Sequence, residues 1–212
     1  MNAHISQEAI NEVLEAALVM DRKGLMSTFE GNISVKRDGL LYITPTQTSK
    51  GSLTPAMIAV YDESGSQVAG EFKASSELSM HTALYGMREG ISAVAHAHPP
   101  YLTAHAICHK TVTADCYPEF LALFSEIPVA PYGSPGSRGI YAGVAPLIQD
   151  HYVVLLANHG ALAVGSSAAR ACARLEAAEA SAAILDLARR IGSPVPLGEA
   201  EIARILSVTQ PM

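Results

Sequence analysis

Two histidines separated by one residue stand at the end of an apolar, alternating stretch of the chain. His96 and His98 follow a run that begins at Ile91. Because side chains two apart on a strand point to the same face, this spacing predicts two imidazoles that converge. His159, within Asn-His-Gly, is a candidate third ligand. Three imidazoles would bind Zn²⁺ and leave one coordination position open, as in catalytic sites. Strand histidines also serve as hydrogen-bonded core residues, so the spacing alone leaves both interpretations open.

A mixture of helices and strands must position these histidines. Apolar spacing predicts an amphipathic helix from Ser6 to Gly24, followed by short strands with a hairpin turn at Asp38-Gly39. The expected strands lie at residues 32–36, 40–44, 58–61, 91–97 and 152–157. Further helices are expected from Ser75, at 101–109 and at 167–191. The expected class is therefore mixed α/β.

Composition limits the possible partners. A chain of 212 residues that is 49% hydrophobic can bury one sizeable core, so we expect a single domain over residues 1–212. The net charge of -6 argues against nucleic acid or an anionic membrane as the main partner. The three cysteines show no metal or disulfide spacing, and no signal peptide or membrane-length apolar segment is evident. These features favour a cytoplasmic protein.

Five short motifs in order resemble the class II aldolase/adducin family, and most closely its fuculose-phosphate aldolase branch. The resemblance covers about residues 6 to 190. The motifs are Gly31-Asn32-Ile33-Ser34, Thr44-Pro45-Thr46, Ser75-Ser76-Glu77, His96-Ala97-His98 and Asn158-His159-Gly160. The resemblance implies a three-layer α/β/α domain with a central, largely antiparallel sheet. It also implies a homotetramer with active sites at subunit interfaces.

The resemblance assigns the metal ligands and a proton-transfer residue. His96, His98 and His159 would bind Zn²⁺ or another divalent metal, consistent with the preference of zinc for neutral imidazoles. Glu77 would move the carbon-bound proton while the metal stabilises an enediolate. The alternative for Glu77 is structural, because Ser-Ser-Glu also begins many helices. His81, four residues after Glu77, is expected to be structural or to support the site.

The resemblance also implies an anion pocket built from neutral donors. Its residues would be Gly31, Asn32, Thr46, Ser75 and Ser76. In isolation, each motif is better explained as a turn, a strand end or a helix cap. Gln47 stands where the related aldolases have glycine. This departure weakens the assumption that the anchored group is a terminal phosphate.

Tyr117 matches a family tyrosine that reaches into a neighbouring subunit's site and protonates the aldehyde oxygen. A phenol is suited to that role, although an aromatic residue packed at an interface explains the position equally well. The family's C-terminal tyrosine has no counterpart after Tyr152. We therefore expect the aldehyde half of the substrate to differ from that of fuculose phosphate. The loop at residues 131–137 lacks a nucleotide-binding pattern and is expected to be structural.

Together, these features predict a lyase of carbohydrate metabolism. It would reversibly cleave a ketose 1-phosphate, or a similar hydroxy-ketone, to dihydroxyacetone phosphate and an aldehyde. The alternatives are a related decarboxylase, dehydratase or sugar-phosphate 4-epimerase. Glu77 disfavours the epimerase, whose pattern carries aspartate there. A non-catalytic adducin-like scaffold is a further alternative, although it would not need the histidines.

Overall fold

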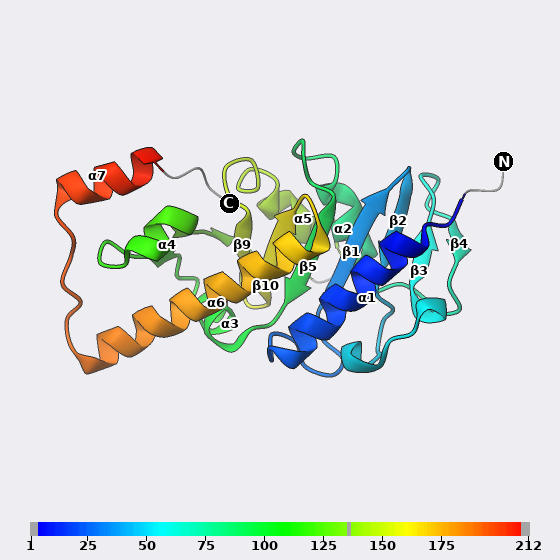
Figure 1. The fold of residues 1–212 in the computed structure, drawn as a ribbon, viewed down its shortest axis with the longest axis horizontal. Helices are drawn as coiled ribbons and strands as arrows, with labels where there is room; N and C mark the ends of the chain where they lie inside the picture. The colour runs from blue at the N-terminus through cyan, green and yellow to red at the C-terminus, as the bar shows by residue number, and fades with distance from the viewer. Residues whose placement is uncertain (1–3, 135–136, 209–212) are drawn as a thin grey trace.

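The computed structural model describes residues 4–134 and 137–208. Its centre is an eight-stranded sheet in the order β4-β3-β2-β1-β5-β10-β9-β8 (Figure 1). Within it, β8 and β9 pair in parallel, and the other neighbouring strands in this order are antiparallel. The strands are β1 (Asn32–Arg37), β2 (Leu40–Ile43), β3 (Ala59–Tyr61), β4 (Gln67–Ala69), β5 (Ala93–Ala97), β8 (Val129–Ala130), β9 (Val153–Leu156) and β10 (Gly160–Gly165). A small second sheet pairs β6 (Val112–Thr113) with β7 (Glu126–Ile127).

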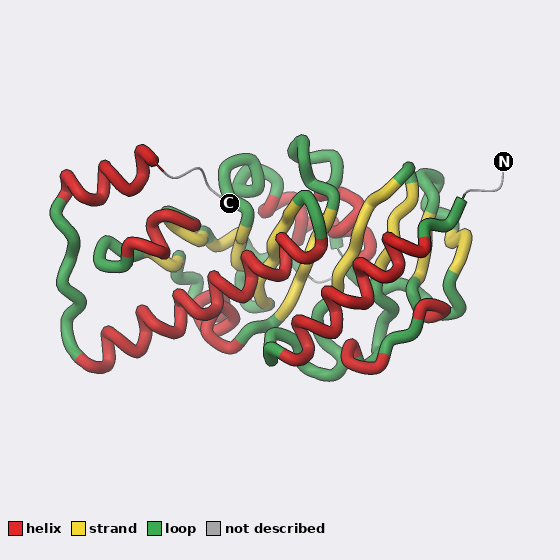
Figure 2. Tube along the Cα trace, viewed as in Figure 1, coloured by secondary structure: helices red, strands yellow, loops and turns green. Residues whose placement is uncertain are grey.

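Helices cover both faces of the large sheet, and Figure 2 shows this layering. The helices are α1 (Gln7–Arg22), α2 (Leu78–Leu84), α3 (Pro100–Ile107), α4 (Pro118–Leu123), α5 (Arg138–Val144), α6 (Ala168–Ile191) and α7 (Glu199–Val208). Two short 3₁₀ turns are η1 (Lys50–Ser52) and η2 (Pro55–Met57). Helices α1, α3 and α6 pack on one face, and α2 and α5 pack on the other. The predicted three-layer α/β arrangement is confirmed.

The alternation of β5 decides which face its histidine joins. Ala93, Ala95 and Ala97 point into the core beneath α1 and α6. Val94 joins the core on the opposite face, beneath α2 and α5. Because successive side chains of a strand alternate, His96 lies on the face of Val94. The site therefore forms on the α2 side of the sheet.

Local signals in the sequence explain the ends of the long helices. The Ser6 hydroxyl accepts from the Ala9 amide at the start of α1. The Ser167 hydroxyl accepts from the Arg170 amide at the start of α6. Each bond satisfies one of the amides that have no partner within a helix, as N-cap side chains do. The hairpin turn is also as predicted, because Asp38 and Gly39 both adopt the positive φ that such a turn needs.

Two regions differ from the sequence-based expectations. Helix α2 begins at Leu78 rather than at Ser75, because the Ser75 hydroxyl accepts from the Glu77 amide in a turn before the helix. Helix α7 was not predicted, and it lies beside α4 after an extended segment that follows α6 (Figure 1). The sequence contains no counterpart of the family's C-terminal tyrosine after Tyr152, and residues 209–212 of that region lie outside the described residues. Residues 135–136 of the loop at 131–137 also lie outside them. Among the described residues, no helix has the length and apolar character needed to cross a membrane.

Candidate active site

Three histidines converge at one end of the central strands. The centroids of the His96, His98 and His159 rings lie 4.6–4.9 Å apart. One nitrogen of each ring lies within 4.8 Å of the others, so the three could hold a metal ion. His96 belongs to β5, His98 follows it, and His159 lies in the turn between β9 and β10. Antiparallel pairing of β5 with β10 brings these segments together.

The Asn-His-Gly turn has steric reasons for its residues. Asn158 adopts a positive φ of 58°, a conformation that asparagine tolerates better than most residues. A Cβ atom on Gly160 would stand 2.5 Å from the Ala97 carbonyl oxygen and 2.5 Å from the His98 ring. Any larger residue would therefore displace β5 or a candidate ligand. The glycine in this motif keeps the turn close to His98.

The hydrogen bonds of His96 determine which ring nitrogen is free. Its Nδ1 lies 2.9 Å from the Ala161 carbonyl oxygen, which can only accept. Nδ1 therefore carries the proton and Nε2 presents a lone pair, the arrangement common among metal-binding histidines. That nitrogen lies 3.1 Å from His98 Nε2 and 3.2 Å from Glu77 Oε2. Electron pairs converging on one point fit a bound cation.

Two further buried atoms support this interpretation. His159 Nδ1 and Glu77 Oε1 are both buried without a hydrogen-bond partner. Buried polar atoms without partners are uncommon in native proteins and often mark a place for an ion or ligand. Glu77 Oε1 also lies 3.6 Å from His159 Nε2. The donor set of three imidazoles beside one carboxylate suits zinc.

Burial and charge set the protonation of these groups. Burial lowers the pKa of His96 to about 3, although Glu77 partly offsets the effect. Burial also lowers the pKa of His159. For Glu77, burial raises the pKa. Attraction to His96 and the hydrogen bond from Asn32 lower it by more than burial raises it, so the net shift is downward. Neutral imidazoles and an ionised carboxylate are the forms that a cation requires.

A chain of buried hydrogen bonds leads away from Glu77. Asn32 Nδ2 donates to Glu77 Oε2 at 2.8 Å, which leaves Asn32 Oδ1 as an acceptor for His81 Nε2. His81 Nδ1 must then accept from the Ser34 hydroxyl, 2.6 Å away. Tyr85 in turn donates to Ser34 at 2.6 Å. The orientation of the Asn32 amide therefore determines which group donates in every hydrogen bond between Glu77 and Tyr85.

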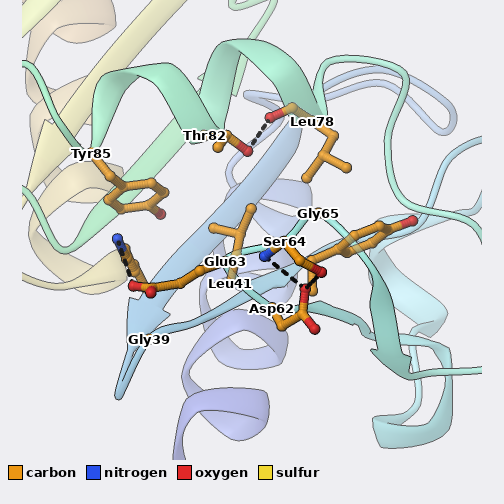
Figure 3. A pocket seen from close by; sticks show the side chains of 11 residues that line it. Gly39, Leu41, Asp62, Glu63, Ser64, Gly65, Leu78, Thr82 and Tyr85 are labelled. Carbon is orange, nitrogen blue, oxygen red and sulfur yellow. Dashed lines mark hydrogen bonds and ion pairs between the residues drawn. The ribbon is translucent and has the colours of Figure 1, made fainter.

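His81 thus supports the site, as the sequence suggested, and does not belong to the histidine cluster. Burial lowers the pKa of His81 to about 4, so it is neutral near pH 7. Tyr85, the last residue in this series of hydrogen bonds, lines a separate cavity of about 360 Å³ (Figure 3). That cavity is bounded by Leu41 and by Leu78 and Thr82 of α2. None of the three clustered histidines lines it.

A pocket of about 180 Å³ adjoins the histidine cluster. All five residues predicted for the anion pocket line it, together with Glu77, His98 and His159. Those five are Gly31, Asn32, Thr46, Ser75 and Ser76. Gly31 has a φ of 75°, and a Cβ there would stand 2.9 Å from the His96 carbonyl oxygen. Glycine therefore lets the chain pass close to β5 at the pocket wall.

The pocket also contains a cation that the sequence analysis missed. Lys50 lines it and is only 2% exposed, with Nζ donating to the Thr48 carbonyl at 2.9 Å. Burial lowers the pKa of Lys50, and Asp21 partly opposes the shift. Lys50 follows Gln47, which has a positive φ of 52°. Glycine would adopt that φ without strain, whereas Gln47 adopts it with a side chain.

Tyr117 lies elsewhere in the chain. It precedes α4 and packs, half-buried, against the core beneath α1 and α6. It does not line the pocket beside the histidines. Within one chain, the structure therefore does not bring Tyr117 to the candidate site.

The sheet order and the histidine cluster define the class: a mixed α/β protein with a candidate metal centre where two central strands end. Residues 11–185 match the model of the Class II Aldolase and Adducin N-terminal domain. The chain belongs to this family.

Several known proteins resemble the chain over most of its length. L-fuculose phosphate aldolase of Escherichia coli strain K12 is 33% identical over 197 residues, covering 92% of this chain and 91% of that protein. 3-oxo-tetronate 4-phosphate decarboxylase of Escherichia coli O6:H1 is 29% identical, covering 86% and 88%. A solved structure of an L-fuculose 1-phosphate aldolase superposes with a TM-score of 0.87 at 29% identity, covering 96% of each chain. Relatives named for two different reactions thus resemble this chain over most of its length.

Proposed function

We propose that the protein is a zinc-dependent aldolase that reversibly cleaves a ketose 1-phosphate to dihydroxyacetone phosphate and an aldehyde. The observation that carries the proposal is the placement of Glu77 between the histidine cluster and the pocket that contains Lys50. The aldolase relative, at 33% identity, supports the same reaction class.

His96, His98 and His159 would hold the zinc ion. When bound, the ion would supply a Lewis acid that stabilises negative charge developing on substrate oxygens. The Ala161 carbonyl fixes the His96 ring in the form that presents Nε2.

Glu77 would transfer the proton on carbon. Its Oε2 is fixed by the amide of Asn32, whereas Oε1 has no hydrogen-bond partner. In the direction of synthesis, Oε1 would take a proton from the carbon next to the carbonyl of dihydroxyacetone phosphate. The electron pair left on that carbon would form the new bond to the aldehyde carbon. In cleavage, the same bond breaks and Oε1 returns the proton to that carbon.

The pocket beside the histidines would anchor the phosphate. The hydroxyls of Thr46, Ser75 and Ser76 supply neutral donors, and Lys50 supplies a buried positive charge. Ammonium groups bind phosphate as point charges and hydroxyls add directional bonds. This combination is better suited to a dianion than the neutral donors that the sequence suggested.

Tyr117 would protonate the aldehyde oxygen from a second copy of the chain. Tyr117 does not line the pocket of its own chain, so this role would need an assembly, for which we propose a homotetramer with sites between subunits. Substituting Tyr117 with Phe would then reduce turnover without changing metal content.

The test is carbon-carbon bond formation from dihydroxyacetone phosphate and a panel of aldehydes by the zinc-loaded protein. Glu77→Gln should keep the metal and lose most turnover, while Glu15→Gln, an exposed control on α1, should leave turnover unchanged. Absence of any condensation or cleavage would contradict the aldolase proposal. Carbon dioxide release from a phosphorylated 3-oxo acid would instead identify a decarboxylase, the reaction named for the relative at 29% identity.

A further inference from the structure

Three arginines gather around Tyr152, at the opposite end of the central strands from the histidines. Arg88 and Arg174 each stack on the Tyr152 ring, with guanidinium carbons 4.0 and 3.6 Å from the centroid. Arg170 and Arg174 lie one turn apart on α6, and both line a cavity of about 220 Å³. Tyr152, Ile91, Gly165 and Ser166 complete most of its wall.

Within the described residues, no ion pair neutralises the positive charge of this cluster. Among the described residues, no carboxylate oxygen lies within 4.0 Å of the guanidinium nitrogens of Arg88, Arg170 or Arg174. Glu89 lines the cavity but is exposed and forms no ion pair. Paired arginines do occur in this acidic protein, as Arg37 with Glu12 shows. The exposed Arg190 likewise forms no ion pair within the described residues, so what distinguishes this cluster is that Arg174 is buried without one.

Arg174 is the most informative member because it is only 4% exposed. One guanidinium nitrogen donates to the Val164 carbonyl, while Nε is buried without a partner. Burial lowers the pKa of Arg174 to about 10, and Tyr152 partly offsets this, while repulsion from Arg170 and Arg88 adds to it. A buried charge is costly unless it is paired, so an anion in the cavity would stabilise the folded protein.

We propose that this cavity is a binding site for a small free oxyanion, such as inorganic phosphate or the phosphate group of a small metabolite. Guanidinium groups bind phosphate through paired hydrogen bonds, and the exposed Arg170 and the buried Arg174 both line this cavity. The volume is ample for an ion of that size.

The site is separate from the proposed catalytic pocket. Its wall includes Ile91, before β5, and Gly165, the last residue of β10. The histidine cluster lies where β5 ends and β10 begins. The two cavities have no lining residue in common. Anion binding at Arg170 and Arg174 therefore does not depend on the aldolase proposal.

The experiment is isothermal titration of the full-length, zinc-loaded protein with inorganic phosphate at constant ionic strength. The titration is repeated in Lys50→Met protein, which separates binding beside the histidines from binding at the arginine cluster. Arg170→Gln should weaken phosphate binding at the arginine cluster at least tenfold. Arg190→Gln, which removes the same charge from the exposed far end of α6, should change it less than twofold.

Arg174→Met provides a second measurement that does not require a catalytic assay. In the Lys50→Met background, replacing this buried, unpaired guanidinium with an apolar side chain of similar length should abolish the rise in Tm that phosphate binding at the arginine cluster produces. Sodium chloride at matched ionic strength should give no such rise in the wild type. Arg170 is exposed, so Arg170→Gln remains informative if Arg174→Met does not fold.

Two results would overturn the proposal. The first is phosphate binding that is equally tight in Arg170→Gln, Arg174→Met and Arg190→Gln proteins. The second is the absence of phosphate binding in the Lys50→Met protein. If Arg170→Gln also dissociates the oligomer in sedimentation experiments, a carboxylate of another subunit fills the cavity.

Discussion

The hydrogen-bond chain from Glu77 to Tyr85 predicts that two conservative replacements of His81 have unequal effects. Glutamine places its amide nitrogen near the position of Nε2, so His81→Gln keeps the donor to Asn32. Asparagine reaches only the position of Nδ1, so His81→Asn keeps an acceptor for Ser34 and removes that donor. Ser34 has Tyr85 as a second partner, whereas Asn32 Oδ1 has no other hydrogen-bond partner within the described residues. The asparagine variant should therefore be the less stable of the two.

The structure also sets the size of the effect. His81 and Ser34 are 0% exposed and Asn32 is 4% exposed, so water cannot replace the lost donor. Leaving a buried acceptor without a partner costs about 1–3 kcal/mol. In a protein of this size, each kcal/mol lowers Tm by about 2–4 °C. His81→Gln should lose less than half as much as His81→Asn.

The measurements are urea unfolding and the pH dependence of turnover for both variants. Without its donor, Asn32 can rotate its amide, so Glu77 Oε2 would lose the bond that holds it as a carboxylate. His81→Asn should therefore lower kcat and raise the apparent pKa of the catalytic base, and His81→Gln should restore most of both. Equal stability and equal pH profiles in the two variants would refute the assigned direction of the bonds.

Three further predictions concern the site and its surroundings. Gly160→Ala should reduce zinc content well below one ion per chain, because its Cβ would meet Ala97 and His98 at 2.5 Å; unchanged metal analysis would contradict this. Lys50→Met should raise KM for a phosphorylated substrate by more than it changes kcat, as steady-state kinetics can test against an unphosphorylated analogue. The metal-free protein should lose stability as the pH falls from 6.5 to 4, because the folded pKa of His81, about 4, lies below its unfolded value of 6.5. The unfolded state then binds more protons, which costs up to about 3 kcal/mol, and His81→Gln should lose less over that range.

Periodicity and motif order predicted much of this molecule. The long helices were predictable because Ser6 and Ser167 cap them and apolar residues recur at helical spacing. The convergence of His96 with His98 followed from strand geometry, although their meeting with His159 rested on family resemblance. Pairing of β5 with β10 is a long-range contact that no local pattern specifies.

The missed features depend on tertiary packing. Lys50 stands in a polar stretch of sequence, which is typical of an exposed lysine. Only the fold of that loop buries it beside the pocket. Helix α7 has amphipathic spacing that could have been recognised, since Ile202, Ile205 and Leu206 recur at helical intervals. The arginine cluster joins segments from α6 and from the region after α2, so sequence spacing could not reveal it.

The carbonyl of Ala161 holds His96, and the paired strands β5, β9 and β10 position the segments that carry the three histidines. The entropy of ordering the ligands is therefore lost during folding and not during metal capture. Ligands that are already ordered can bind an ion at each productive encounter. The rate of metal uptake by the folded apo-protein should therefore be first order in protein and first order in metal. Metal that is removed by a chelator should then be replaced without unfolding, and the protein could exchange ions with its surroundings throughout its lifetime.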